Sequence, residues 1–367
     1  MAVSSPRRIV FACAALSLAL AFATPSASAG GGADSAAPLV LGGRGSFFIG
    51  GETVAQDFVE LGSLRPADTV TVNQMYVDYM LPPDGRRKTP VVMVHGAGLS
   101  GSCYDTTPDG RMGWYEYFVR NAHPVYVVDQ IGRGRSGFNQ AIFNNVRAGR
   151  EDPSKLPRIT RMGDLHASWI NFRFGPEKGV SYPDSQFPVE AAAHLSQMGI
   201  PDLDAALPSP NPNAGALAQL AEKAGGAILL GHSQSGHYPI QSALLRPDAV
   251  SGMILIEPGT CLQDTLTSAQ IETLAGIPLL VVYGDHLSAS TELPGNVPGW
   301  QQRFDGCKAL IGRIRQAGGR ADMLYPPERG IHGNSHMIMQ DRNNLQIAGL
   351  IMEWIATNIA EKAKTQP

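Results

Sequence analysis

Short, continuous apolar runs recur along the chain and alternate with segments in which apolar residues return every three or four positions. The runs cover residues 90–95, 125–129, 227–231, 253–257 and 278–283. Runs of this length are typical of strands buried on both faces of a sheet. Helical periodicity appears in residues 114–121, 216–223, 239–245, 302–317 and 342–361. This alternation predicts an α/β fold, a mostly parallel sheet with helices on both faces.

The residues before the first buried run follow a different pattern. Residues 46–54 predict a hairpin whose turn is Gly50-Gly51, and residues 69–79 alternate as a further strand. Residues 30–44 are rich in Gly, Ala and Ser, which favours a flexible N-terminal segment. We therefore expect the folded domain to cover residues 45–363.

One stretch interrupts the alternation. Asp129 and Ala227 are separated by far more than the ~30 residues of a simple strand–helix–strand crossover. Within it, residues 138–215 are rich in Pro, Asn and aromatic side chains. Long ordered insertions often carry function, so this pattern predicts an inserted cap over the site. The alternative is a surface excursion with no role in binding.

The first residues have the pattern of an export signal. Arg7 and Arg8 precede an apolar run over residues 9–23, and Ala27-Ser28-Ala29 fits a cleavage site. Residues 1–29 are therefore predicted to be a signal peptide, which places the protein in the periplasm or outside the cell. The paired arginines leave a twin-arginine route open beside the general one. No later segment is apolar enough for stable membrane insertion.

Composition and charge narrow the classes of function. The chain has 367 residues, a hydrophobic fraction of 43% and a formal net charge of -3. This charge gives no support to a nucleic-acid partner, because such proteins usually carry a basic stripe. His, Cys and acidic residues do not fall at the spacing of metal ligands, so neither a metal nor another cofactor is expected.

The strongest chemical motif is Gly231-His232-Ser233-Gln234-Ser235-Gly236, between a buried run and a helical segment. It resembles the G-x-S-x-G nucleophile elbow of α/β-hydrolases, in which a serine stands on a sharp turn from strand to helix. Ser235 replaces the last glycine but is still small. The motif predicts Ser233 as a nucleophile, and the alternative is an ordinary serine-rich turn.

A serine nucleophile needs a base, and the base needs an orienting carboxylate. His336 precedes the last helical segment, where this fold places its base, and His332 is the alternative. Glu257 and Asp285 each follow a late strand and compete as the acid. The superfamily commonly has its acid about three residues beyond the glycine of the later strand, a position held here by Leu287.

Four motifs carry a closer resemblance. They are His-Ser-Gln-Ser-Gly at 232–236, Glu-Pro-Gly-x-Cys at 257–261, Thr-Thr-Pro-Asp-Gly-Arg-Met-Gly-Trp at 106–114 and His-Gly-Asn-Ser-His-Met at 332–337. Together they resemble a group of secreted bacterial esterases of the esterase 713 type, over residues 45–358. The resemblance implies Glu257 as the acid and His336 as the base. Ala97-Gly98 departs from it, because the type member has two cysteines there.

Three cysteines remain after the signal peptide: Cys103, Cys261 and Cys307. An oxidising compartment favours one disulfide and one free thiol, although three unpaired buried residues are the alternative. Cys261 and Cys307 both flank the late strands, and the family resemblance implies that these two pair.

The predicted activity is hydrolysis of a carboxylic ester through an acyl-enzyme on Ser233. Backbone N–H groups of Ala97 and Gln234 are expected to form the oxyanion hole. The expected partner is a small-molecule ester, and a homodimer is left open. Alternatives are a lactonase, polyester hydrolase or peptidase on the same scaffold, or a non-catalytic binding protein with a hydrolase fold.

Overall fold

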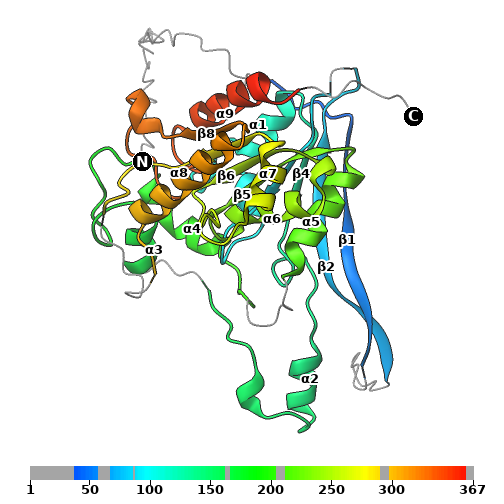
Figure 1. Ribbon diagram of the computed structural model, residues 1–367. Coiled ribbons are helices and arrows are strands. Elements are labelled where there is room, and N and C mark those ends of the chain that lie inside the picture. The colour runs from blue at the N-terminus through cyan, green and yellow to red at the C-terminus, as the bar shows by residue number, and fades with distance from the viewer. Residues whose placement is uncertain are drawn as a thin grey trace, which may run out of the picture. The chain divides into compact units, whose positions relative to one another are not determined.

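Eight strands form one mostly parallel sheet in the computed structural model, which describes residues 37–56, 67–85, 87–161, 166–203, 211–289 and 297–360 (Figure 1). Their order is β1-β2-β4-β3-β5-β6-β7-β8. The strands are β1 (Gly43–Gln56), β2 (Asp68–Leu81), β3 (Val91–Val94), β4 (Val125–Val128), β5 (Ala227–His232), β6 (Val250–Ile256), β7 (Leu279–Val282) and β8 (Ala321–Leu324). β1, β2 and β4 pair antiparallel, and the neighbouring pairs from β4 to β8 are parallel. The predicted sheet is confirmed, and β8 was not predicted.

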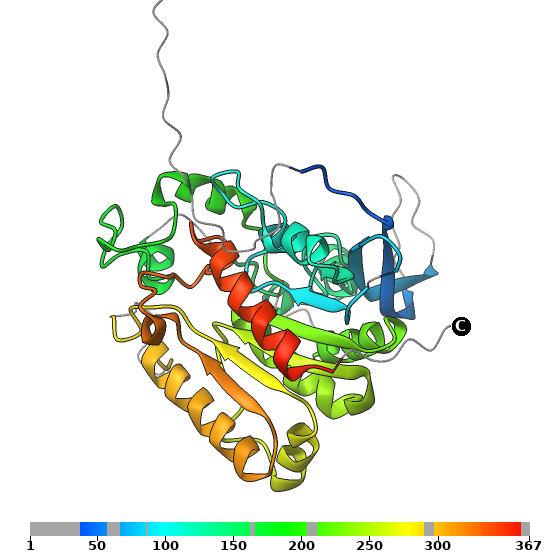
Figure 2. The same cartoon turned by 90° about the horizontal axis from the view of Figure 1, so that it is seen from above.

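Helices cover both faces of this sheet. They are α1 (Trp114–Arg120), α2 (Ala141–Arg147), α3 (His166–Asn171), α4 (Ala192–Met198), α5 (Pro212–Lys223), α6 (Tyr238–Leu245), α7 (Ser268–Ala275), α8 (Trp300–Gln316) and α9 (Asn344–Asn358). Apolar side chains of α5 to α8 pack in one buried cluster, and those of α1 and α9 pack in another. Figure 2 shows α8 in orange and α9 in red on opposite sides of the sheet. Within the described residues, no helix combines the length and apolar character needed to cross a bilayer.

The N-terminal part of the sheet differs from the prediction. Gly50 and Gly51 do not turn the chain, because β1 continues through them and pairs with β2 along its whole length. Both glycines have positive φ, 66° and 89°, and Gly51 is left out of the strand pairing together with Asn73, which also has positive φ, while the register on either side stays the same. Glycine adopts such angles at little cost, so the pair makes an irregularity within a strand and not a hairpin turn. The strand begins at Gly43, inside the segment expected to be flexible.

The insertion divides into two parts. Its first part contains α2, which has no buried residue and lies away from the sheet (Figure 1). Its second part is attached to the body of the fold: Ile200 N donates to Gly98 O at 2.9 Å, and Asp202 forms a buried ion pair with Arg133 at 2.5 Å. Apolar side chains of this second part are buried as well, among them Phe174, Phe187 and Leu195. The predicted signal peptide lies outside the described residues.

Candidate active site

Ser233 stands at the junction of β5 and the short 3-10 helix η5 (Ser233–His237). Its φ is 57°, an angle that non-glycine residues rarely adopt outside constrained sites. The elbow needs space at Gly236, where an added Cβ would lie 2.6 Å from the Cα of Pro258. Ser235 is buried, and its Oγ lies 3.0 Å from Val94 O and 3.0 Å from the amide nitrogen of His232. A hydroxyl at this position therefore joins the two strands, which explains why serine replaces the usual glycine.

The structure brings Ser233 together with His336 and Glu257. Ser233 Oγ lies 2.9 Å from His336 Nε2, and His336 Nδ1 lies 3.1 Å from Glu257 Oε2. His232 holds the backbone of His336 in place, because its Nε2 donates to His336 O at 3.0 Å. Both members of the His336–Glu257 pair are almost fully buried. The arrangement can pass a proton from the serine hydroxyl to an imidazole held by a carboxylate.

The two alternative residues form a separate pair. Asp285 Oδ2 lies 3.1 Å from His332 Nδ1 and accepts the backbone N–H of Gly333 at 3.1 Å. The His332 side chain is more than half exposed. Asp285 therefore braces the loop that leads to His336 and is not in hydrogen-bond contact with His336 itself.

Glu257 is held by a group that the sequence analysis missed. Arg173 Nη2 donates to Glu257 Oε1 at 2.6 Å, and the backbone N–H of Gly284 donates to the same oxygen. Burial by itself raises the pKa of Glu257, but the charges of Arg173 and His336 and their hydrogen bonds outweigh it and lower the pKa to about 2. The only sequence signal for Arg173 is a single cation between two phenylalanines. The carboxylate therefore stays ionised throughout the neutral range.

His336 is enclosed by aromatic rings. The ring centroids of Trp300 and Phe172 lie 4.3 Å and 5.1 Å from that of the imidazole. Burial lowers the pKa of His336, and the hydrogen bond and charge of Glu257 only partly oppose this effect. The imidazole is therefore neutral at pH 7, which is the form that can accept a proton.

A cavity of about 270 Å³ opens above Ser233 and His336. One wall is the loop from Gly96 to Leu99, and Ala97 is its exposed residue. An added Cβ on Gly96 would lie 2.9 Å from the Cβ of Ser233, so only glycine lets this loop approach the serine so closely. Gln234 follows Ser233 as the second residue of η5.

The insertion also lines this cavity, through Thr160, Arg161, Asn171, Phe172 and Asp202.

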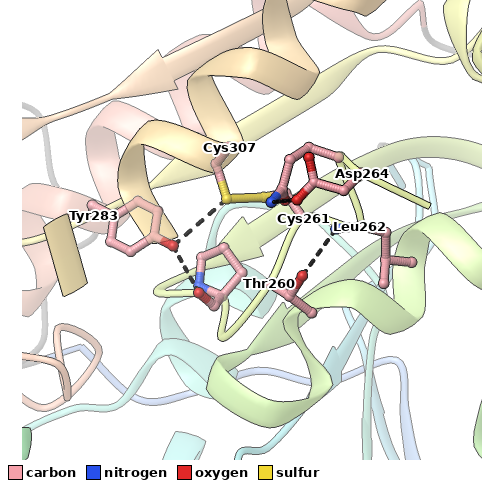
Figure 3. Close-up of a disulfide and its surroundings, with 8 residues drawn as sticks. Thr260, Cys261, Leu262, Asp264, Tyr283 and Cys307 are labelled. Atoms are coloured by element: carbon pink, nitrogen blue, oxygen red, sulfur yellow. Dashed lines mark hydrogen bonds between the residues drawn. A yellow bond between two sulfur atoms is a disulfide. The ribbon is translucent and has the colours of Figure 1, made fainter. Parts of the chain in front are cut away.

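A disulfide between Cys261 and Cys307 fastens the loop after Glu257 to α8 (Figure 3). Tyr283 supports the same loop, because its hydroxyl donates to Pro258 O at 2.7 Å. The remaining described cysteine, Cys103, is free and buried. The loop that carries Glu257 is thus fixed at both ends, by the sheet and by the disulfide.

Asp184, Asp285 and His286 bring their ligand atoms within 4.8 Å of one another, a grouping that the sequence spacing did not predict. His286 Nε2 lies 2.9 Å from Asp184 Oδ1, and its ring stacks on Tyr182. Hydrogen bonds among these groups account for their positions, and acidic surface groups commonly gather in this way, so we assign them no ligand.

The fold and the arrangement around Ser233 define an α/β-hydrolase. No family model matches the chain. A solved structure described as a novel bacterial esterase is 43% identical in sequence and superposes with a TM-score of 0.82. The match covers 89% of this chain and 98% of the esterase. The chain belongs to the family of this esterase and is a carboxylic-ester hydrolase. A probable secreted lipase, phiG, from a fungus (Fungal sp. strain ATCC 74256) is 28% identical over 77% of this chain and 85% of its own length.

Proposed function

We propose that the protein cleaves small carboxylic esters through a Ser233–His336–Glu257 triad and an acyl-enzyme intermediate. Ser233 Oγ attacks the ester carbonyl while its proton moves to His336 Nε2. The tetrahedral intermediate collapses, and His336 returns the proton to the departing alcohol. Water then attacks the acyl group with the same base, which releases the acid and restores Ser233.

The unbroken line of hydrogen bonds from Ser233 Oγ through His336 to Glu257 supports this proposal most directly. The ionised Glu257 stabilises the imidazolium that forms during each proton transfer. We assign the backbone N–H groups of Ala97 and Gln234 to the oxyanion hole. Gln234 directly follows Ser233, and Ala97 follows Gly96, which packs closely against Ser233.

The size of the cavity bears on the substrate. Its volume of about 270 Å³ lies below the range of about 300–1,000 Å³ that is usual for drug-sized ligands. We therefore propose short-chain esters as substrates, and we propose that the inserted cap, residues 138–215, limits their length through the residues that line the cavity. Hydrolysis rates for p-nitrophenyl esters from acetate to laurate should fall steeply with chain length, and a rising series contradicts the assignment.

Labelling tests the nucleophile. A fluorophosphonate should modify the wild-type protein once, at Ser233, and peptide mass spectrometry locates the adduct. Ser233→Ala should lose both labelling and hydrolysis of p-nitrophenyl acetate. Ser251→Ala is a matched control, because Ser251 lies near the other end of the strand that precedes Glu257. Turnover that survives in Ser233→Ala would exclude the proposed mechanism.

We also propose that residues 1–29 direct export and are removed, in line with the secreted description of the fungal relative. N-terminal sequencing of the protein recovered from periplasm or medium should begin at Gly30. A chain that retains Met1 in those fractions contradicts this proposal.

A further inference from the structure

Arg173 lies where the insertion meets the loops that carry the site. Its guanidinium is 0% exposed, donates from Nη2 to Glu257 and donates from Nε to Asp285 O at 2.7 Å. The guanidinium carbon also lies 5.0 Å from the centre of the Trp300 ring. One side chain of the insertion thus contacts the residues that follow β6 and β7 and the first residue of α8.

The two residues before Arg173 contact the same region. Phe172 O accepts the backbone N–H of His336 at 2.9 Å, and Asn171 O accepts the indole N–H of Trp300 at 2.8 Å. Three consecutive residues therefore hold the base, the acid and the aromatic ring beside the base. Arg173 itself has a φ of 59°, a conformation that persists in a bulky residue only where surrounding contacts fix it.

The two carboxylate oxygens of Glu257 have different hydrogen-bond partners. Arg173 and the Gly284 N–H both donate to Oε1, which leaves Oε2 for His336. A buried carboxylate with a free oxygen could rotate or take up a proton, and either change would remove the partner of the imidazole. Arg173 opposes both changes, because it supplies a buried positive charge and a fixed donor geometry.

We propose that Arg173 is a positioning residue for ester hydrolysis, which orients Glu257 toward His336 and makes correct docking of the insertion a condition for an assembled site. This inference rests on the proposed function. It assigns the insertion a second role, since residues 171–173 would then order the catalytic groups as well as enclose the substrate.

The charge of Arg173 gives this role a measurable signature. Charged and titratable groups that act on His336 are Glu257 after β6, Arg173 from the insertion, Arg303 on α8 and His232 at the end of β5. Arg173 and Arg303 lower the pKa of His336, and Glu257 raises it. Removal of the Arg173 charge raises the pKa of His336 as long as Glu257 keeps its contact, whereas a displaced or protonated Glu257 lowers that pKa. Either change moves the acid limb of the rate profile away from its wild-type position.

The experiment compares Arg173→Met, Arg173→Lys and a matched control, Arg313→Met, with p-nitrophenyl acetate as the substrate. Arg313 on α8 donates to Gln263 O and Leu266 O, so its loss removes hydrogen bonds without touching the site. Arg173→Met should lower kcat/KM about 10- to 100-fold and move the acid limb away from its wild-type position. Arg173→Lys should keep the acid limb in place but lower kcat, because an ammonium cannot reproduce the two fixed hydrogen bonds.

The control Arg313→Met should leave kcat/KM and the acid limb unchanged while lowering the melting temperature. The inference is overturned if Arg173→Met has the wild-type acid limb and rate, or if Arg313→Met shifts the limb equally. Should Arg173→Met fail to fold, Arg173→Lys decides, and an unchanged kcat overturns the inference. Turnover in Ser233→Ala would instead overturn the proposed function, so the two failures are distinguishable.

Discussion

Replacing Glu257 with glutamine tests the choice of acid most sharply. The change keeps the shape of the side chain but removes the charge that faces His336 Nδ1 at 3.1 Å. At an effective dielectric constant of about 20, a unit charge pair at this distance is worth roughly 5 kcal/mol, and about 1.4 kcal/mol corresponds to a factor of ten in rate. Arg173 offsets part of this energy. The expected loss in kcat is therefore roughly 10³- to 10⁴-fold.

The assay is steady-state hydrolysis of p-nitrophenyl acetate at pH 8, with circular dichroism to verify the fold. Asp285→Asn is the matched control, because Asp285 is also an acid after a late strand but pairs with His332. It should lose less than about tenfold, the effect of a less well braced loop. If Asp285→Asn abolishes turnover while Glu257→Gln retains it, the assignment of the acid is wrong.

Three further predictions concern the loops and the base. A Cys261→Ser/Cys307→Ser protein should lose about 4 kcal/mol of unfolding free energy in urea, because the disulfide closes a loop with a sequence separation of 46 residues; an unchanged midpoint contradicts this. Gly96→Ala should lower kcat/KM about 100-fold by pushing the loop away from the serine, whereas Gly312→Ala, where an added Cβ meets nothing within 4 Å, should remain fully active. The acid limb of kcat/KM should have its midpoint below pH 6.5, since the lowered pKa of His336 keeps the imidazole neutral to lower pH; a midpoint above 7 refutes the burial argument.

The sheet could be predicted from the sequence because its central strands are buried on both faces. All residues of β3 and β7 are buried, so their apolar runs are unbroken. β8 was missed because it lies at the sheet edge, and Asp322 and Met323 within it are only partly buried. The helix α7 was not predicted either, although Thr267 and Gln270 form a capping box at its start, which is a signal visible in the sequence.

The candidate site was only partly predictable for a related reason. Ser233 belongs to a local motif whose turn geometry dictates its residues. The choice between Glu257 and Asp285, by contrast, depends on which histidine each meets in space. Arg173 had no local signal beyond its position between two phenylalanines, because its partners lie 84 and 112 residues away along the chain.

In the proposed triad the acid follows β6, and not β7 as the superfamily pattern suggests. β6 is adjacent to β5, so a glutamate just beyond its end lies close enough to reach the histidine that serves Ser233. The turn after β7 then contributes a backbone donor to that glutamate at Gly284, and Asp285 is free to hold Gly333 and His332. An acid placed at the end of β7 would have to compete with this brace. The proposed acid therefore follows β6, because Asp285 after β7 already holds Gly333 and His332. The guanidinium of Arg173 supplies the positive charge that stabilises the buried carboxylate of Glu257.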